Sequence, residues 1–218
     1  MGEIAVGRIL ARLGPEWTVL HAVPVGAGAS DIDHVLIGPG GVFTLNTKNH
    51  SGQSVWVAGR TLMVAGKKQR HIANSVHEAV RAAKFLTTAA GEVVPVTGVL
   101  VIVDAKSLPV REKPADVVVV TDRQLLRWLN RRRRVLTPEQ IAGITAAAIL
   151  PTTWHRNPAP DGDITTLQQG FENLRKLVGR ARRRRAAWAL ALVVVLVIVL
   201  ANVVPMLAGV ALQSLMHR

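Results

Sequence analysis

The chain has 218 residues and a formal net charge of +13, with 49% hydrophobic and 4% aromatic residues. This length allows one domain of about 150 residues plus an appendage. The absence of cysteine excludes a disulfide framework and a thiolate metal site, and the few aromatics argue against a platform for stacking single-stranded bases. The excess of Lys and Arg favours polyanionic partners, either nucleic acid or an anionic membrane surface. The alternative is an Arg-rich surface that is simply solvated.

The N-terminal segment predicts an amphipathic helix over Gly2–Leu13. Val6, Ile9, Leu10 and Leu13 follow the i, i+3, i+4, i+7 spacing, and Gly14-Pro15 ends the pattern. We expect no signal peptide here, because a basic start followed by an apolar run is missing. A strand over Trp17–Val25 and a glycine-rich loop over 26–29 follow.

Residues 30–51 predict a β-hairpin. Val35-Leu36-Ile37 and Val42-Phe43-Thr44-Leu45 flank the turn Gly38-Pro39-Gly40-Gly41. If Ile37 lies opposite Val42, the same register places Val35 opposite Thr44, Asp33 opposite Asn46 and Asp31 opposite Lys48. Alternation then projects the four polar side chains from one face, which is costly unless they are solvated or used.

These residues resemble a known family. The pieces that carry the resemblance are Ile32-Asp33-His34, Gly40-Gly41-Val42-Phe43, Asn46-Thr47-Lys48-Asn49 and Ser51-Gly52. They resemble the nuclease-related domain (NERD), a branch of the PD-(D/E)xK, restriction-endonuclease-like nucleases. The resemblance covers roughly residues 2–86, and 96–103 more loosely. It implies an α/β fold with a restriction-endonuclease-like mixed sheet flanked by helices.

The resemblance also implies a metal-dependent site for Mg²⁺ or Mn²⁺. Its catalytic positions correspond to Asp33, Lys48, Asn46 and Glu3, and its metal ligands to Asp33, Asn46, the Thr47 carbonyl and Glu78. Asn46 stands where the family has Glu, which predicts weakened metal affinity. Glu78 stands where the family usually has Gln, so it is a replacement ligand or a partner of Arg81 on the helix surface. For Glu3 the alternative is a carboxylate favoured by the helix N-terminus.

The middle of the chain predicts further strands and helices. A second short hairpin covers 55–57 and 61–64, and a basic loop follows, whose Lys67, Lys68 and Arg70 either contact substrate phosphates or are solvated. A helix over 74–89 is predicted to bury Val76, Val80, Ala83 and Phe85 or Leu86, and to end at Gly91. Strands over 93–103 and 117–120 precede a helix over 123–134, capped by Asp122, and a helix from Thr137 to Leu150.

The C-terminal part predicts a membrane anchor. The domain is expected to span 1–150, followed by a proline-rich linker over 151–163 and a basic juxtamembrane amphipathic helix over 164–185. The apolar run 186–212 exceeds the roughly 20 residues that span a bilayer, and a short tail covers 213–218. Arg182–Arg185 predict a cytoplasmic N-terminal domain on a single-pass cell-membrane protein and would bind anionic lipid headgroups.

Two functions follow from these observations. One is a membrane-anchored, metal-dependent nuclease that hydrolyses phosphodiester bonds with Asp33 and Lys48 at its centre. The other is a catalytically impaired, membrane-tethered module that binds nucleic acid or a protein partner, because Asn46 replaces the family's Glu. The sequence leaves open the identity of any protein partner and whether the chain is an enzyme.

Overall fold

The computed structural model describes residues 2–25 and 31–155. The predicted loop over 26–29, the predicted linker beyond His155, the basic helix over 164–185, the membrane span over 186–212 and the tail lie outside these residues. Within 2–25 and 31–155, no helix is long and apolar enough to cross a membrane.

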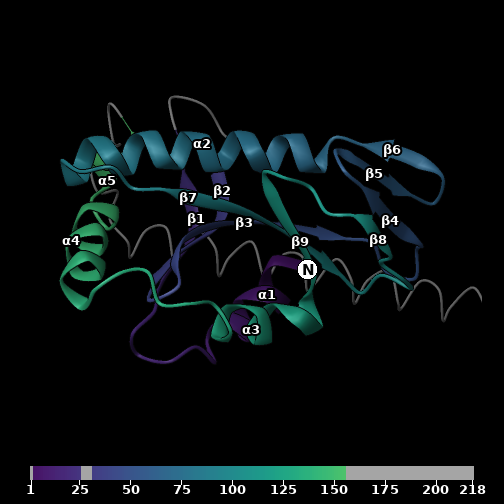
Figure 1. The fold of residues 1–218 in the computed structure, drawn as a ribbon, viewed down its shortest axis with the longest axis horizontal. Coiled ribbons are helices and arrows are strands. Elements are labelled where there is room, and N and C mark those ends of the chain that lie inside the picture. The colour runs from purple at the N-terminus through teal and green to yellow at the C-terminus, as the bar shows by residue number, and fades with distance from the viewer. Residues whose placement is uncertain (1, 26–30, 156–218) are drawn as a thin grey trace, which may run out of the picture. The chain divides into compact units, whose positions relative to one another are not determined.

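A five-stranded mixed sheet forms the centre of the domain (Figure 1). Its order is β1 (Thr18–Pro24), β2 (Asp31–Gly38), β3 (Gly41–Asn49), β7 (Val96–Val103) and β9 (Val117–Thr121). The first three strands are antiparallel, and β7 and β9 run parallel to β3. The predicted mixed α/β architecture is therefore confirmed.

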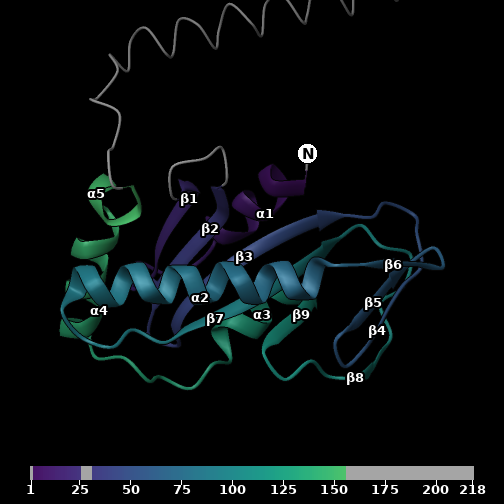
Figure 2. The same ribbon diagram turned by 90° about the horizontal axis from the view of Figure 1, so that it is seen from above.

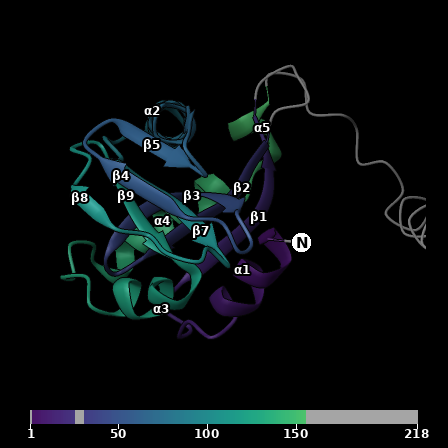
Figure 3. The ribbon, with the colours of Figure 1, turned by 90° about the vertical axis from the view of Figure 1, so that its right-hand side faces the viewer.

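Helices cover both faces of this sheet (Figures 1 and 3). On one face, α2 (His71–Ala90), α4 (Pro138–Ala148) and α5 (Pro151–Trp154) bury a core around Val35, Ile37 and Val42. On the other face, α1 (Gly2–Leu10) and α3 (Asp122–Asn130) bury a core around Leu36, Phe43 and Leu45. Because alternate side chains enter different cores, the central strands are apolar on both faces, as parallel-type strands require.

A second, four-stranded sheet lies beyond the N-terminal end of α2 (Figure 2). Its order is β6 (Lys67–Gln69), β5 (Thr61–Val64), β4 (Val55–Ala58) and β8 (Val110–Glu112). The predicted second hairpin is confirmed as β4 and β5. The prediction that Lys67 and Lys68 lie on a loop was wrong, because they form β6, a strand too polar and too short to show hydrophobic alternation.

Several predicted helix features change in the structure. α2 begins at His71 and buries Ile72, Ser75, Ala79, Ala82 and Leu86, whereas the predicted core residue Val80 is 63% exposed. The buried face of α2 is therefore rotated around the helix axis from the predicted one. Its small residues let α2 lie close to the sheet. The capping residue of α3 is Thr121 and not Asp122. The predictions of Thr137 as the cap of α4 and Gly91 as the end of α2 are confirmed.

The folded core continues past the predicted boundary at residue 150. Pro151–Trp154 form α5, and Trp154 is buried in the core beneath β2 and β3. Its indole Nε1 donates a hydrogen bond to the Ala148 carbonyl oxygen at 2.7 Å. The first part of the predicted linker thus belongs to the folded unit.

Candidate functional site

The candidate site begins where the β2–β3 hairpin opens. The predicted register holds near the turn, where Ile37 pairs with Val42 and Val35 with Thr44, but the ladder ends at His34 and Leu45. Beyond that point each strand keeps only its other neighbour: β2 stays paired with β1 as far as Asp31, and β3 stays paired with β7 as far as Asn49. The direct pairings of Asp33 with Asn46 and Asp31 with Lys48 are therefore absent from the described ladder, because each strand follows its other neighbour.

Where the hairpin opens, the Asp33 carboxylate replaces a backbone carbonyl as the hydrogen-bond acceptor for β3. The Thr47 backbone N–H donates to Asp33 Oδ2 at 2.6 Å. An extended residue directs its N–H and C=O to the same side of the strand, so the Thr47 carbonyl also faces the side of β3 on which Asp33 lies. The hairpin opening thus places a carboxylate and a backbone carbonyl near each other.

Asn46 and Glu78 connect β3 to α2. Asn46 is 4% exposed, and its Nδ2 donates to Glu78 Oε1 at 2.6 Å across 32 residues of sequence. The predicted alternative partner, Arg81, instead donates from Nη2 to the Val25 carbonyl oxygen at 3.1 Å. Among the described residues, Glu78 makes no ion pair with Arg81. Glu78 therefore points into the sheet opening and not along the helix surface.

The electrostatics of Glu78 show which charges surround it. Burial raises the pKa of Glu78, and the nearby Asp33 carboxylate raises it further. The hydrogen bond from Asn46 and the cations Lys48 and Arg81 act on this pKa in the opposite direction. The structure thus brings Asp33, Asn46, Lys48 and Glu78 together.

Two oxygens of this cluster lack partners. Asn46 Oδ1 and Glu78 Oε2 are buried and accept no hydrogen bond within the part of the chain that the structure describes. Buried polar oxygens are normally satisfied, so a water molecule or a cation is the expected partner of these two neighbouring oxygens. The described residues hold no group of three or more His, Cys, Asp or Glu side chains placed as metal ligands. Any cation here would rely on mixed carboxylate, amide and backbone carbonyl oxygens, the type that Mg²⁺ and Mn²⁺ accept.

The other predicted site residues have exposed side chains. Glu3 lies on α1 near the cluster, because its neighbour Gly2 packs against the Thr47 side chain and its own backbone is hydrogen-bonded to His34. Its side chain forms no hydrogen bond or ion pair with Asp33, Asn46 or Lys48 within the described residues. Lys67, Lys68 and Arg70 are exposed on β6 and at the entry to α2. Their contact with substrate remains a prediction.

A histidine pair beside Lys48 escaped the sequence reasoning. The Nε2 atoms of His50 and His71 lie 3.2 Å apart, and their rings are stacked. Burial, followed by His50 and then Lys48, lowers the pKa of His71 to about 4; burial and Lys48 also lower the pKa of His50. Both rings are therefore neutral at pH 7. In the sequence, His50 is simply two residues beyond Lys48, and its distance from His71 follows no spacing that predicts a pair.

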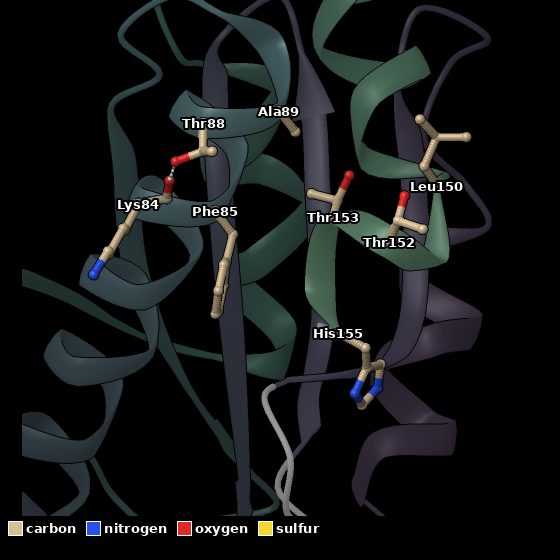
Figure 4. A pocket seen from close by; sticks show the side chains of 8 residues that line it. All are labelled: Lys84, Phe85, Thr88, Ala89, Leu150, Thr152, Thr153 and His155. Carbon is tan, nitrogen blue, oxygen red and sulfur yellow. Dashed lines mark hydrogen bonds between the residues drawn. The ribbon is translucent and has the colours of Figure 1, made fainter. Parts of the chain in front are cut away.

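A surface cavity of about 480 Å³ lies at the opposite end of α2, where it meets α5 (Figure 4). Lys84, Phe85, Thr152 and His155 are among its lining residues. None of the predicted site residues line it. The cavity and the polar cluster are therefore separate features.

Comparison with known proteins gives one family match, which covers the segment that contains the polar cluster. Residues 1–103 match the family model NERD, described as nuclease-related domain. This match confirms the sequence resemblance for that segment, which contains Asp33, Asn46, Lys48 and Glu78. No curated protein and no solved structure matches the chain.

Proposed function

We propose that this nuclease-related domain is a metal-dependent phosphodiesterase that acts on nucleic acid, with a cation site shared between β3 and α2. The observation that carries the proposal is the Asn46–Glu78 contact with its two unpartnered oxygens. Three features of the site support this proposal: the identity of the two side chains, the fit of a cation and the position of Lys48.

The first feature is an exchange of side-chain types. In the family pattern that the sequence resembles, the β3 position carries Glu and the α2 position usually carries Gln. Here β3 carries Asn46 and α2 carries Glu78, and the two are hydrogen-bonded at 2.6 Å. One carboxylate and one amide are thus retained in contact, with their places exchanged. This exchange supports a working site, because it restores the carboxylate that Asn46 removes.

The second feature is the fit of a divalent cation. Asp33 and Glu78 supply two carboxylates, and Asn46 Oδ1 and the Thr47 carbonyl supply neutral oxygens. The raised pKa of Glu78 reflects burial and the charge of Asp33, two costs that a bound cation would remove. When bound, a divalent metal polarises a phosphoryl oxygen and lowers the pKa of an attacking water.

The third feature is the role of the chain's own cation. Lys48 is half-buried beside Glu78 and beside the neutral His50–His71 pair. Its ammonium group would bind a phosphoryl oxygen and stabilise the negative charge that develops on it. In the hydrolysis, a water molecule loses a proton as its oxygen bonds to phosphorus, the bridging P–O bond breaks, and the leaving oxygen takes up a proton. Asp33, held by the Thr47 N–H, keeps its orientation during this step.

The proposal includes attachment to the cell membrane through residues 186–212. The support for this part is the sequence alone: an uncharged apolar run preceded by Arg182–Arg185. The enzyme would then act on nucleic acid at the cytoplasmic membrane surface, with anionic lipids around the arginines.

The test is a two-residue exchange in the full-length protein. Glu78→Gln should abolish the rise in melting temperature that Mn²⁺ gives the parent, together with any cleavage of a labelled oligonucleotide. Asn46→Glu alone should bind Mn²⁺ more tightly but melt lower in EDTA, because two carboxylates then face each other. Asn46→Glu with Glu78→Gln should recover both metal binding and cleavage.

Glu92→Gln is the matched control, because Glu92 is an exposed carboxylate just beyond α2. Equal Mn²⁺ shifts in the parent, Glu78→Gln and the control would contradict the cation site. A parent that binds nucleic acid but neither binds Mn²⁺ nor cleaves would favour the alternative function, a tethered binding module.

A further inference from the structure

A row of four side chains crosses the outer face of the second sheet, one from each strand. Trp56 on β4 lies opposite Met63 on β5, and Met63 lies opposite Lys68 on β6. From β8, the Arg111 guanidinium carbon lies 5.5 Å from the centre of the Trp56 ring. Directly paired residues share a face of a sheet, so the row runs Arg111, Trp56, Met63, Lys68.

The two faces of this sheet differ in character. Val55, Val57, Leu62 and Val64 point inward and are buried. In the row, Trp56 and Met63 are partly exposed, and Lys68 and Arg111 are exposed, so this face is open within the described part of the chain. An aromatic ring and a thioether side by side form a small apolar patch that is rimmed by cations, an arrangement typical of an interaction surface.

The surroundings of the row are strongly basic. Residues 52–70 contain four cations, namely Arg60, Lys67, Lys68 and Arg70, and no acidic residue. On and next to β8, Arg111 and Lys113 flank the single carboxylate of Glu112. Among the described residues, the one ion pair within 4 Å joins Arg134 to Glu16 and involves none of these cations. The face is therefore complementary to a polyanion.

We propose that this row, called here the tryptophan row, binds single-stranded nucleic acid through its bases as well as its phosphates. An unpaired base stacks on the Trp56–Arg111 pair, since both an indole and a guanidinium plane stack on bases. Lys68, at the other end of a row about 14 Å long by strand spacing, binds a phosphate of the same strand. A single tryptophan thus provides a stacking site for a base, although the low aromatic content of the chain argued against such a site.

Chain continuity links the tryptophan row to the polar cluster. β6 runs through Arg70 into α2, whose first residue His71 contacts His50, and Lys48 is close enough to lower the pKa of both histidines. A nucleic-acid strand bound to the tryptophan row would therefore lie on β6, which leads into α2 and so to the proposed cleavage site. The inference deepens the proposed function by naming an unpaired strand as substrate, but binding by the row does not require cleavage.

The test measures binding of the full-length protein in EDTA, where metal-dependent cleavage is off. The probes are a labelled 15-residue oligothymidylate, an abasic oligonucleotide of equal length, and the corresponding duplex. Trp56→Ala should weaken oligothymidylate binding about 10-fold and leave abasic binding unchanged. Trp56→Phe, which keeps a stacking ring, should stay close to the parent and shows that the fold survives.

The cations should act differently. Lys68→Ala should weaken binding of both single-stranded probes and reduce the slope of log affinity against log salt by about 0.7. Arg123→Ala is the matched control, because it removes one exposed charge from α3, on the other sheet. It should change neither affinity nor slope.

Three outcomes would overturn the inference. Trp56→Ala could bind oligothymidylate as tightly as the parent, or lose abasic binding equally, and either result would reduce the row to a phosphate-binding surface. A preference for vesicles of phosphatidylglycerol over oligothymidylate, lost in Trp56→Ala, would make the row a membrane-binding face. Normal binding without Mn²⁺-dependent cleavage would leave the inference standing and contradict only the proposed function.

Discussion

The two ends of the β2–β3 hairpin differ in pairing and in burial. At the turn end, Ile37 and Val42 are paired, apolar and buried against α2, α4 and α5. At the open end the ladder stops after His34 and Leu45, the Asp33 carboxylate accepts the Thr47 N–H across the gap, and Asn46 donates to Glu78 on α2. Pairing and burial stabilise the turn end, whereas unpaired oxygens make the open end suited to a ligand. One hairpin can therefore supply both a rigid, buried scaffold and an open end that carries polar groups.

The largest effect on stability is expected from a substitution at the turn end of the hairpin. A Cβ added at Gly38 would overlap the ring of Trp17, so Gly38→Ala should lower the stability by about 1–3 kcal/mol in a thermal melt. Trp17→Ala in the same chain should recover part of this loss, because it removes the clash. Gly143→Ala is the control, since its Cβ meets nothing within 4 Å inside α4, and it should stabilise slightly. Equal melting of Gly38→Ala and the parent would mean that Trp17 does not pack here.

A smaller effect of the opposite sign is expected at the open end. Because burial raises the pKa of Glu78, this carboxylate favours folding below its unfolded pKa and costs stability as pH rises through its folded pKa. Without metal, Glu78→Gln should therefore melt higher than the parent, by a margin that grows from pH 4.5 to pH 7. Melting curves in EDTA across this range, with Glu92→Gln beside them, measure the margin. A margin independent of pH would show that Glu78 is not desolvated.

The smallest effect concerns the histidines next to Lys48. The pKa of His71 is lowered to about 4 in the folded protein, so between pH 6.5 and 4 the unfolded chain binds a proton that the folded chain does not. Stability should be complete above pH 6.5 and fall as pH drops toward 4. His71→Asn should flatten this part of the pH dependence, and His77→Asn, on an exposed position of α2, should leave it unchanged. If the stability of the parent and of His71→Asn changed equally with pH, His50 and His71 would not form a neutral pair.

Local patterns in the sequence were enough to predict several elements correctly. The turn Gly38–Gly41 and the period-two alternation gave the register of the hairpin, and Thr137 and Gly91 marked helix ends. Each of these depends on interactions among residues a few positions apart, which the sequence displays directly. The stripe of α2 was mispredicted, because small buried residues such as Ser75 and Ala79 carry little hydrophobic signal.

The polar groups of the domain, including Asn46 and Glu78, can be read directly from the sequence. Their hydrogen bond across 32 residues, and the bond from the Thr47 N–H to Asp33, follow instead from the three-dimensional fold. The same holds for the tryptophan row, whose members come from four strands. The physical reason is that long-range neighbours are set by how strands diverge and helices cross, which depends on the packing of both cores at once.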